Sequence, residues 1–148
     1  MNPNVFSILL IILAGGATAL QAPTNARLMT AVGSPVNAAF VSFAVGTAAL
    51  GLLALIFHTK PDIAAARALP WYAWIGGLYG VVFVIAATWG VPRLGVALTI
   101  TLMVAGQLLI SLILDHLGAF GAPQQPINLG RMVGVALVIG GVMMVRRF

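Results

Sequence analysis

The sequence has 148 residues, of which 61% are hydrophobic and only 6% are charged, with a mean hydropathy of +1.12 and no cysteine. Soluble domains usually carry about a quarter charged residues, so this composition excludes an ordinary soluble globular protein. The formal net charge of +5 requires no nucleic-acid partner, because basic residues at the ends of membrane helices bind anionic lipid headgroups. We therefore expect an integral membrane protein whose surroundings are lipid.

The apolar runs predict helices rather than strands. About 20 apolar residues span the bilayer as a helix, whereas a barrel strand takes about 10 residues in alternation, and the runs here are long and do not alternate. The predicted fold is one all-α domain over residues 1–148. Its five predicted transmembrane spans cover approximately residues 5–28, 35–57, 71–91, 94–114 and 130–146.

The connections between these spans are short. They comprise a turn at Gly33 to Pro35, the segment 58–70, the pair Pro92-Arg93, and a loop from Gly118 to Gly130 that is rich in Gly, Pro and Gln. We expect the first span to be retained rather than cleaved as a signal peptide, because no Lys or Arg precedes its apolar core.

Basic residues are almost equally divided between the two ends of the predicted spans. Short loops rich in Lys and Arg stay cytoplasmic, so an even division favours neither orientation. Dual topology, with copies inserted both ways up, is one interpretation, and a single orientation imposed by other flanking features is the alternative. One end carries Lys60, Arg67 and Arg131, and the other carries Arg93, Arg146, Arg147 and, within the first span, Arg27.

Polar residues inside the predicted spans are candidates for a solute pathway, because unsatisfied polar groups are costly in the bilayer. Thr18, Gln21 and Asn25 share one face of the first span, at i, i+3 and i+7. A second polar stripe follows the fourth span. We interpret the two stripes as two walls of a pathway. The second stripe consists of Thr99, Gln107, Ser111 and Asp115.

Two other features of the spans each leave two interpretations open. Tyr79, in a row with Tyr72 and Phe83, could stack on a solute or belong to the aromatic belt expected near span ends. Pro23, between Gln21 and Asn25, could open the helix and free carbonyl groups for a neutral polar site. Alternatively the helix ends there, and the two amides cap it.

Small residues offer sites of close helix contact. Gly130 and Gly134 have the GxxxG spacing and lie with Gly141 in the fifth span, where they could pack a dimer interface. Gly76 and Gly80 repeat the spacing in the third span. The alternative is packing within one subunit.

Asp115 and His116 form the only acid-histidine pair near a span. They could couple transport to protons, or Asp115 could pair with Arg93 of an antiparallel second copy, or both could simply mark the water boundary. We expect no metal site, because His58 and His116 are isolated from further ligands. No phosphate-binding loop, nucleophile-base set or cofactor motif is present in the sequence. We therefore expect that the chain is not an enzyme and binds no cofactor.

The sequence resembles the five-helix YdcZ-type branch of the drug/metabolite transporter superfamily along its whole length. The resemblance rests on Gly15-Gly16, Gln21 and Asn25, on Ser42-Phe43 with Gly46-Thr47, and on the run Ala105-Gly106-Gln107-Leu108 with Gly95, Ser111, Asp115-His116 and Gly118. Arg131, Gly134, Gly141 and Val142 fit the last helix. The resemblance implies a bacterial inner-membrane transporter in which two five-helix units pair into a ten-helix whole, in some members as antiparallel copies of one chain or as two fused halves.

The chain also resembles the small multidrug resistance proteins, whose antiparallel dimers export cations by means of a carboxylate in the first helix. The first span of this chain, however, has no acidic residue. Neutral amides cannot exchange protons near physiological pH, so that family's proton coupling does not transfer directly. The sequence therefore predicts a homodimeric transporter of small solutes. In it, Gln21, Asn25, Gln107 and Ser111 form hydrogen bonds, Tyr79 stacks, and Asp115 pairs or titrates. A non-transporting membrane scaffold or regulatory subunit is the alternative.

Overall fold

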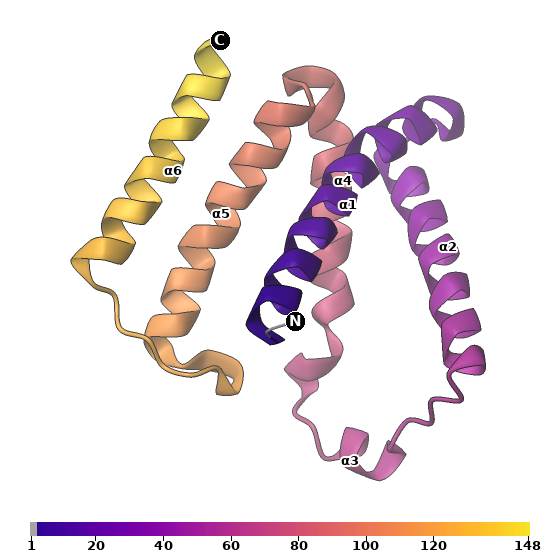
Figure 1. Ribbon diagram of the computed structural model, residues 1–148. Helices are drawn as coiled ribbons and strands as arrows, with labels where there is room; N and C mark the ends of the chain where they lie inside the picture. Colours follow the sequence, from indigo (N-terminus) through magenta and orange to yellow (C-terminus); the bar gives the residue numbers. More distant parts are fainter. Residues whose placement is uncertain (1–2) are drawn as a thin grey trace. The chain divides into compact units, whose positions relative to one another are not determined.

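The computed structural model describes residues 3–148, and within that range it contains helices and no strand (Figure 1). Five helices are long and apolar enough to cross a membrane. The chain divides into two compact units after Arg93. The long helices are α1 (Pro3–Val32), α2 (Pro35–Ile56), α4 (Gly76–Leu94), α5 (Val96–Leu117) and α6 (Leu129–Arg147), and the short ones are α3 (Ile63–Arg67), η1 (Trp71–Trp74) and η2 (Ala119–Gly121).

The first unit begins with a hairpin of α1 and α2, which are joined by Gly33 and Ser34. The Ser34 hydroxyl accepts a hydrogen bond from the Asn37 N–H at 3.0 Å, and Pro35 takes the first helical position, where a missing N–H costs nothing. The buried residues of the hairpin lie near this turn. They are Ala22, Asn25 and Ala26 of α1 and Ala38 and Ala39 of α2.

Helix α1 runs without interruption through Pro23 to Val32, so the predicted first span is too short and the helix does not end at the proline. Pro23 removes the N–H that would bond the carbonyl of Ala19. The next residue, Thr24, donates its hydroxyl to the carbonyl of Leu20 at 2.8 Å. Membrane helices tolerate proline because such side-chain bonds satisfy neighbouring carbonyl groups.

Helix α4 is displaced along the sequence from the predicted third span of residues 71–91. Residues 71–74 instead form η1, and α4 continues through Pro92 and Arg93 to Leu94. The predicted connection at Pro92-Arg93 is therefore helical. The break falls at Gly95, whose φ of +81° is readily adopted only by glycine.

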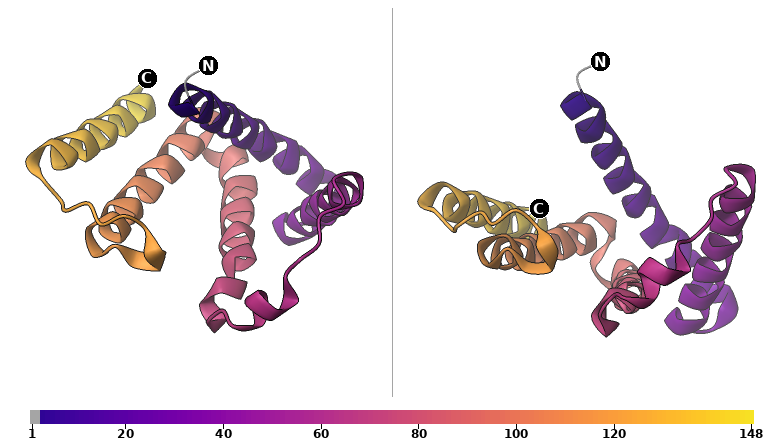
Figure 2. Two further views of the ribbon diagram at one scale, coloured as in Figure 1. Left: turned by 60° about the horizontal axis from the view of Figure 1, so that its bottom comes forward. Right: turned by 90° about the horizontal axis from the view of Figure 1, so that it is seen from below.

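The second unit is an antiparallel hairpin of α5 and α6, which lie side by side in Figures 1 and 2. Gly118 ends α5 in the left-handed conformation, with φ +59°, a common helix stop. Asn128 starts α6 by accepting a hydrogen bond from the Arg131 N–H at 3.0 Å. The α5–α6 loop therefore runs from 118 to 128.

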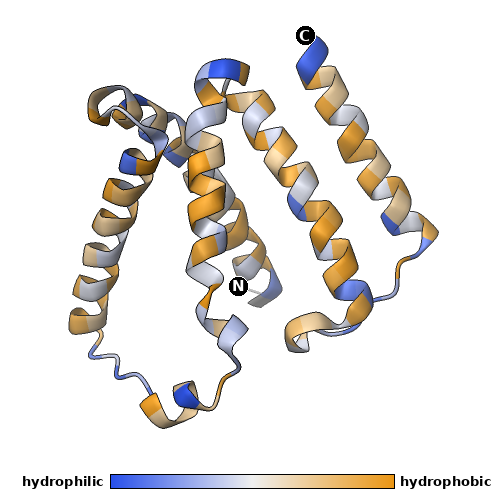
Figure 3. Cartoon of the chain, turned by 180° about the vertical axis from the view of Figure 1, so that it is seen from behind, coloured by the Kyte–Doolittle hydropathy of each residue, from blue (hydrophilic) through white to orange (hydrophobic). Residues whose placement is uncertain are grey.

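Hydropathy follows this architecture. Hydrophobic residues colour most of each long helix, and hydrophilic residues gather at helix ends and connections (Figure 3). Charged residues accordingly mark where each helix would meet water.

Candidate functional site

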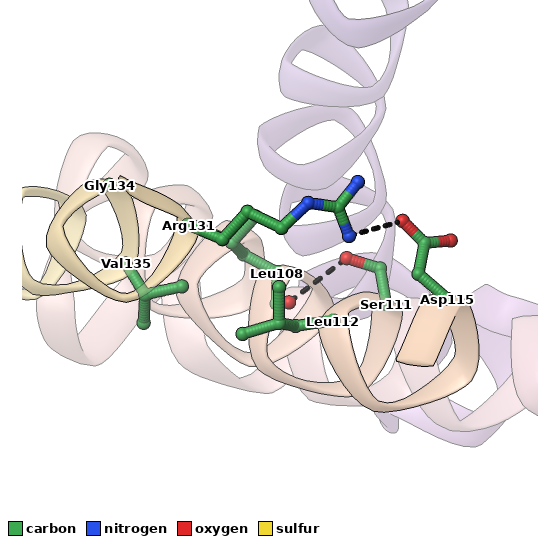
Figure 4. Close-up of a pocket in the computed structure, with 7 residues that line it drawn as sticks. All are labelled: Leu108, Ser111, Leu112, Asp115, Arg131, Gly134 and Val135. Carbon is green, nitrogen blue, oxygen red and sulfur yellow. Dashed lines mark hydrogen bonds and ion pairs between the residues drawn. The ribbon is translucent and has the colours of Figure 1, made fainter. Parts of the chain in front are cut away.

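A groove of about 370 Å³ lies between α5 and α6. Apolar side chains form its walls, and one end carries a hydroxyl and two opposite charges (Figure 4). Small-molecule pockets commonly measure roughly 300–1,000 Å³ and combine apolar walls with a few polar groups. The lining residues are Leu108, Ser111, Leu112, Asp115, Arg131, Gly134 and Val135.

The charges form an ion pair. Arg131 Nη1 lies 3.2 Å from Asp115 Oδ2, and the two side chains are 26% and 41% exposed. The same guanidinium donates to the Gln125 carbonyl at 3.2 Å and to the Gln125 side-chain oxygen. Arginine suits this arrangement because its planar fork can serve several acceptors at once.

Each charge of the pair occupies the end of its helix that is electrostatically unfavourable. Asp115 lies near the C-terminus of α5 and Arg131 near the N-terminus of α6. Helix dipoles favour the opposite arrangement, with cations at a C-terminus and anions at an N-terminus. Helix stability alone therefore does not explain this placement. The attraction between the two side chains offsets the dipoles.

The α5–α6 loop closes over the end of α5 through three hydrogen bonds. The Gln125 N–H donates to the Asp115 carbonyl at 2.8 Å, and Gln124 Nε2 donates to the His116 carbonyl at 2.9 Å. The Ile127 N–H donates to His116 Nδ1 at 3.3 Å. His116 therefore supports the loop. Among the described residues, the Asp115 carboxylate bonds to Arg131 and not to the histidine.

Ser111 and Asp115 were predicted to lie in one stripe, but Arg131 was not predicted as the partner of the acid. Arg131 lies 16 residues beyond Asp115, and only the length of the intervening loop determines whether the two meet. Arg93, the partner considered from a second copy, donates to the Trp89 carbonyl at 2.6 Å. Its guanidinium also lies 3.8 Å from the centre of the Trp89 ring.

The other predicted solute contacts differ in accessibility. Gln107 belongs to the second unit but is not among the groove's lining residues, and it is exposed. In the first unit Gln21 is exposed, Tyr79 is 63% exposed, and Asn25 is 4% exposed. The predicted face of Thr18, Gln21 and Asn25 is thus divided, because the packed surface of α1 runs along Ala22, Asn25 and Ala26.

One buried polar residue was missed by the sequence analysis. Thr88 in α4 is fully buried, and its hydroxyl has no hydrogen-bond partner among residues 3–148; the same holds for Asn25 Nδ2. Thr99 and Thr101, in contrast, donate to carbonyls of their own helix. No spacing with other polar residues distinguishes Thr88 in the sequence.

The glycines differ in what they pack against. A Cβ built at Gly80 would lie 3.3 Å from the ring of Phe43 in α2. The absence of a side chain at Gly80 therefore makes room for the Phe43 ring of the same unit. At Gly134 and Gly141 a Cβ would meet no described atom within 4 Å, and at Gly130 it would meet only Asn128 Oδ1, at 3.4 Å. Gly134 lines the α5–α6 groove, so it faces α5 without close packing.

Comparisons with known proteins give a consistent result. Residues 6–144 match the protein family described as "Putative inner membrane exporter, YdcZ". Inner membrane protein YdcZ of Escherichia coli (strain K12) is 36% identical over 77 residues, which are 52% of this chain and 51% of that protein. The chain thus matches about half the length of this curated relative. No solved structure matches.

Proposed function

Because the chain belongs to the YdcZ family of inner-membrane proteins, we propose that it exports small organic solutes, and that it does so as an antiparallel homodimer. The observation that carries the proposal is the α5–α6 groove. It combines apolar walls with a hydroxyl and an ion pair in a pair of helices long enough to cross the membrane. Such polar groups in membrane helices generally mark substrate pathways.

Two features support pairing of two copies in opposite orientations. The basic residues number three at one end of the spans and four at the other when Arg27 is counted, so insertion has little bias. Gly141 leaves open space beside α6, and small residues let helix backbones approach closely. A second copy of α6 would fill that space.

The proposed mechanism is alternating access between the two copies. In an antiparallel pair the outward and inward states are related by symmetry, as in transporters built from inverted repeats. Gln21, Tyr79 and Gln107 are exposed and are available to a solute or to the second copy. Asn25 is buried and becomes available only if α1 moves.

Export can be tested without knowing the solute. Culture media of bacteria expressing the wild-type chain, the Arg131→Gln variant or an empty vector would be compared by mass spectrometry. We expect at least one small solute to accumulate outside wild-type cells and to fall toward the vector level with the variant at equal membrane abundance. Media that do not differ between wild type and vector would contradict the proposal and favour a scaffold.

The wider pathway has its own test. The double variant Gln21→Leu, Gln107→Leu removes two exposed amides that lie outside the groove. If both line the pathway, export of the identified solute falls while dimer and abundance remain. Unchanged export would remove these two residues from the pathway but leave the groove.

A further inference from the structure

The groove can be assigned a substrate class. We infer that it binds a small zwitterion carrying a short apolar group, such as an aliphatic amino acid. This inference rests on the proposed function, since it names the solute of the same site. It is argued from the hydrogen-bonding capacity that the ion pair and Ser111 leave unused.

One side of the groove accepts hydrogen bonds from a cation. The Ser111 hydroxyl donates to the Leu108 carbonyl at 2.9 Å, so its remaining capacity is to accept. Among the described residues, the bonds of the Asp115 carboxylate use Oδ2, which leaves Oδ1. Ser111 and Asp115 lie one turn apart and point to the same side (Figure 4). Together they suit an ammonium group.

The other side donates to an anion. The bonds of the Arg131 guanidinium to described residues use Nη1 and Nη2, which leaves the Nε–H as a donor. Arg131 stands in the first turn of α6, where the helix dipole also favours negative charge. A carboxylate beside Arg131 therefore meets both a donor and a favourable field.

A zwitterion matches this pair better than an ion of either sign. A cation that engaged Asp115 would compete with Arg131 for it, and an anion on Arg131 would compete with Asp115. A molecule carrying both charges neutralises both residues, and partly buried charges are costly without partners. Leu108, Leu112 and Val135 provide apolar surface for the rest of the molecule, and about 370 Å³ is the small end of ligand-sized pockets.

Binding would be measured on the purified full-length chain in maltoside micelles, by calorimetry and by thermal shift. The probes are L-leucine, 3-methylbutylamine, which keeps only the ammonium group, 4-methylpentanoate, which keeps only the carboxylate, and glycine, which lacks the apolar group. We expect leucine to bind at least about tenfold more tightly than each of the other three. For the two single-charge analogues the lost charged hydrogen bond is worth roughly that factor, and for glycine the lost burial of the isobutyl group is worth about the same.

Matched variants separate the site from general charge effects. Asp115→Asn and Arg131→Gln should each weaken leucine binding by about tenfold or more. Asp62→Asn changes the chain's only other acid, and Arg147→Gln changes a cation at the far end of α6; both should bind leucine as the wild type does. Each variant is accepted only if it elutes as the wild type does on gel filtration.

The outcomes distinguish this inference from the proposed function. Equal binding of leucine and the single-charge analogues, or no binding of any probe, would overturn the inference. So would stabilisation by dihexanoyl phosphatidylethanolamine without stabilisation by leucine, which would make the groove a lipid site. Export found in the culture-medium experiment, with exported solutes that are not zwitterions, would overturn the inference while leaving the exporter intact.

Discussion

Asp115 and Arg131 are the residues on which the account depends, because both lie at the electrostatically unfavourable end of a helix. A double-mutant cycle of Asp115→Asn and Arg131→Gln should give a coupling free energy of about 1 kcal/mol. The value is small because the side chains are 41% and 26% exposed. The measurement is reversible unfolding in mixed micelles.

The same cycle on Asp62 and Arg147, which form no ion pair with each other in the described part of the chain, should give a coupling near zero. Coupling near zero for the Asp115–Arg131 pair as well would show that the two charges do not interact in the folded protein. That result would contradict the ion pair in the groove.

Thr88 permits a second prediction at the residue scale. Its hydroxyl is fully buried and has no partner among the described residues, so Thr88→Val removes an unsatisfied group at constant volume. The free energy of unfolding should stay equal or rise by about 1 kcal/mol. A loss of more than 1 kcal/mol would mean that the hydroxyl has a partner in the working protein.

The sequence predicted some of these residues and missed others for physical reasons. Ser111 and Asp115 were found because helical spacing alone puts them on one side of α5. Arg131 and Thr88 were not found. The contact of Arg131 with Asp115 depends on the conformation of the α5–α6 loop, and the burial of Thr88 depends on how the helices pack. The burial of Asn25 beside an exposed Gln21 likewise depends on which side of α1 packs against its neighbours.

At the scale of elements, the number and type of helices could be predicted from hydropathy, because the bilayer fixes the length of an apolar helix. The ends of helices were less predictable. Pro23 and Pro92 each suggested a break, yet α1 and α4 pass through them. The actual stops at Gly95 and Gly118 use positive φ angles, which hydropathy does not report.

The glycines of α6 give a prediction at this scale. Gly141→Leu should leave membrane insertion and abundance unchanged, because a Cβ at Gly141 would meet no neighbouring side chain of the described residues within 4 Å; Gly134, which lines the groove, is left unchanged. Self-association should weaken about tenfold or more if Gly141 faces a second copy. Energy transfer between fluorescently labelled copies in lipid vesicles measures the association.

Gly80→Leu is the contrasting variant, because its side chain would meet the Phe43 ring. It should lower the stability of the fold itself, by about 1–3 kcal/mol. Self-association that is unchanged in the Gly141→Leu variant would show that this glycine does not form the interface.

At the scale of the whole molecule, the proposed dual topology rests on the near balance of basic residues between the two ends of the spans. Thr59→Lys with Pro123→Lys adds two cations at one end of the spans, and Ala31→Lys with Phe148→Lys adds two at the other; all four positions are exposed. Each pair should fix one orientation, because added Lys residues hold a short loop in the cytoplasm.

If the working unit is antiparallel, each fixed form alone should lose export, and the two expressed together should restore it. Full export by either form alone would contradict an antiparallel unit, and it would favour a parallel one.

The most direct test of the two-orientation account is cysteine labelling, for which the cysteine-free chain is suited. Ala122→Cys places one thiol in the α5–α6 loop at an exposed position with φ −67°, whereas neighbouring Gly121 has φ +79° and would be strained by a side chain. Intact cells are treated with a membrane-impermeant maleimide before and after permeabilisation. The account predicts that about half of the molecules react from outside. Reaction of all molecules from one side only would contradict it.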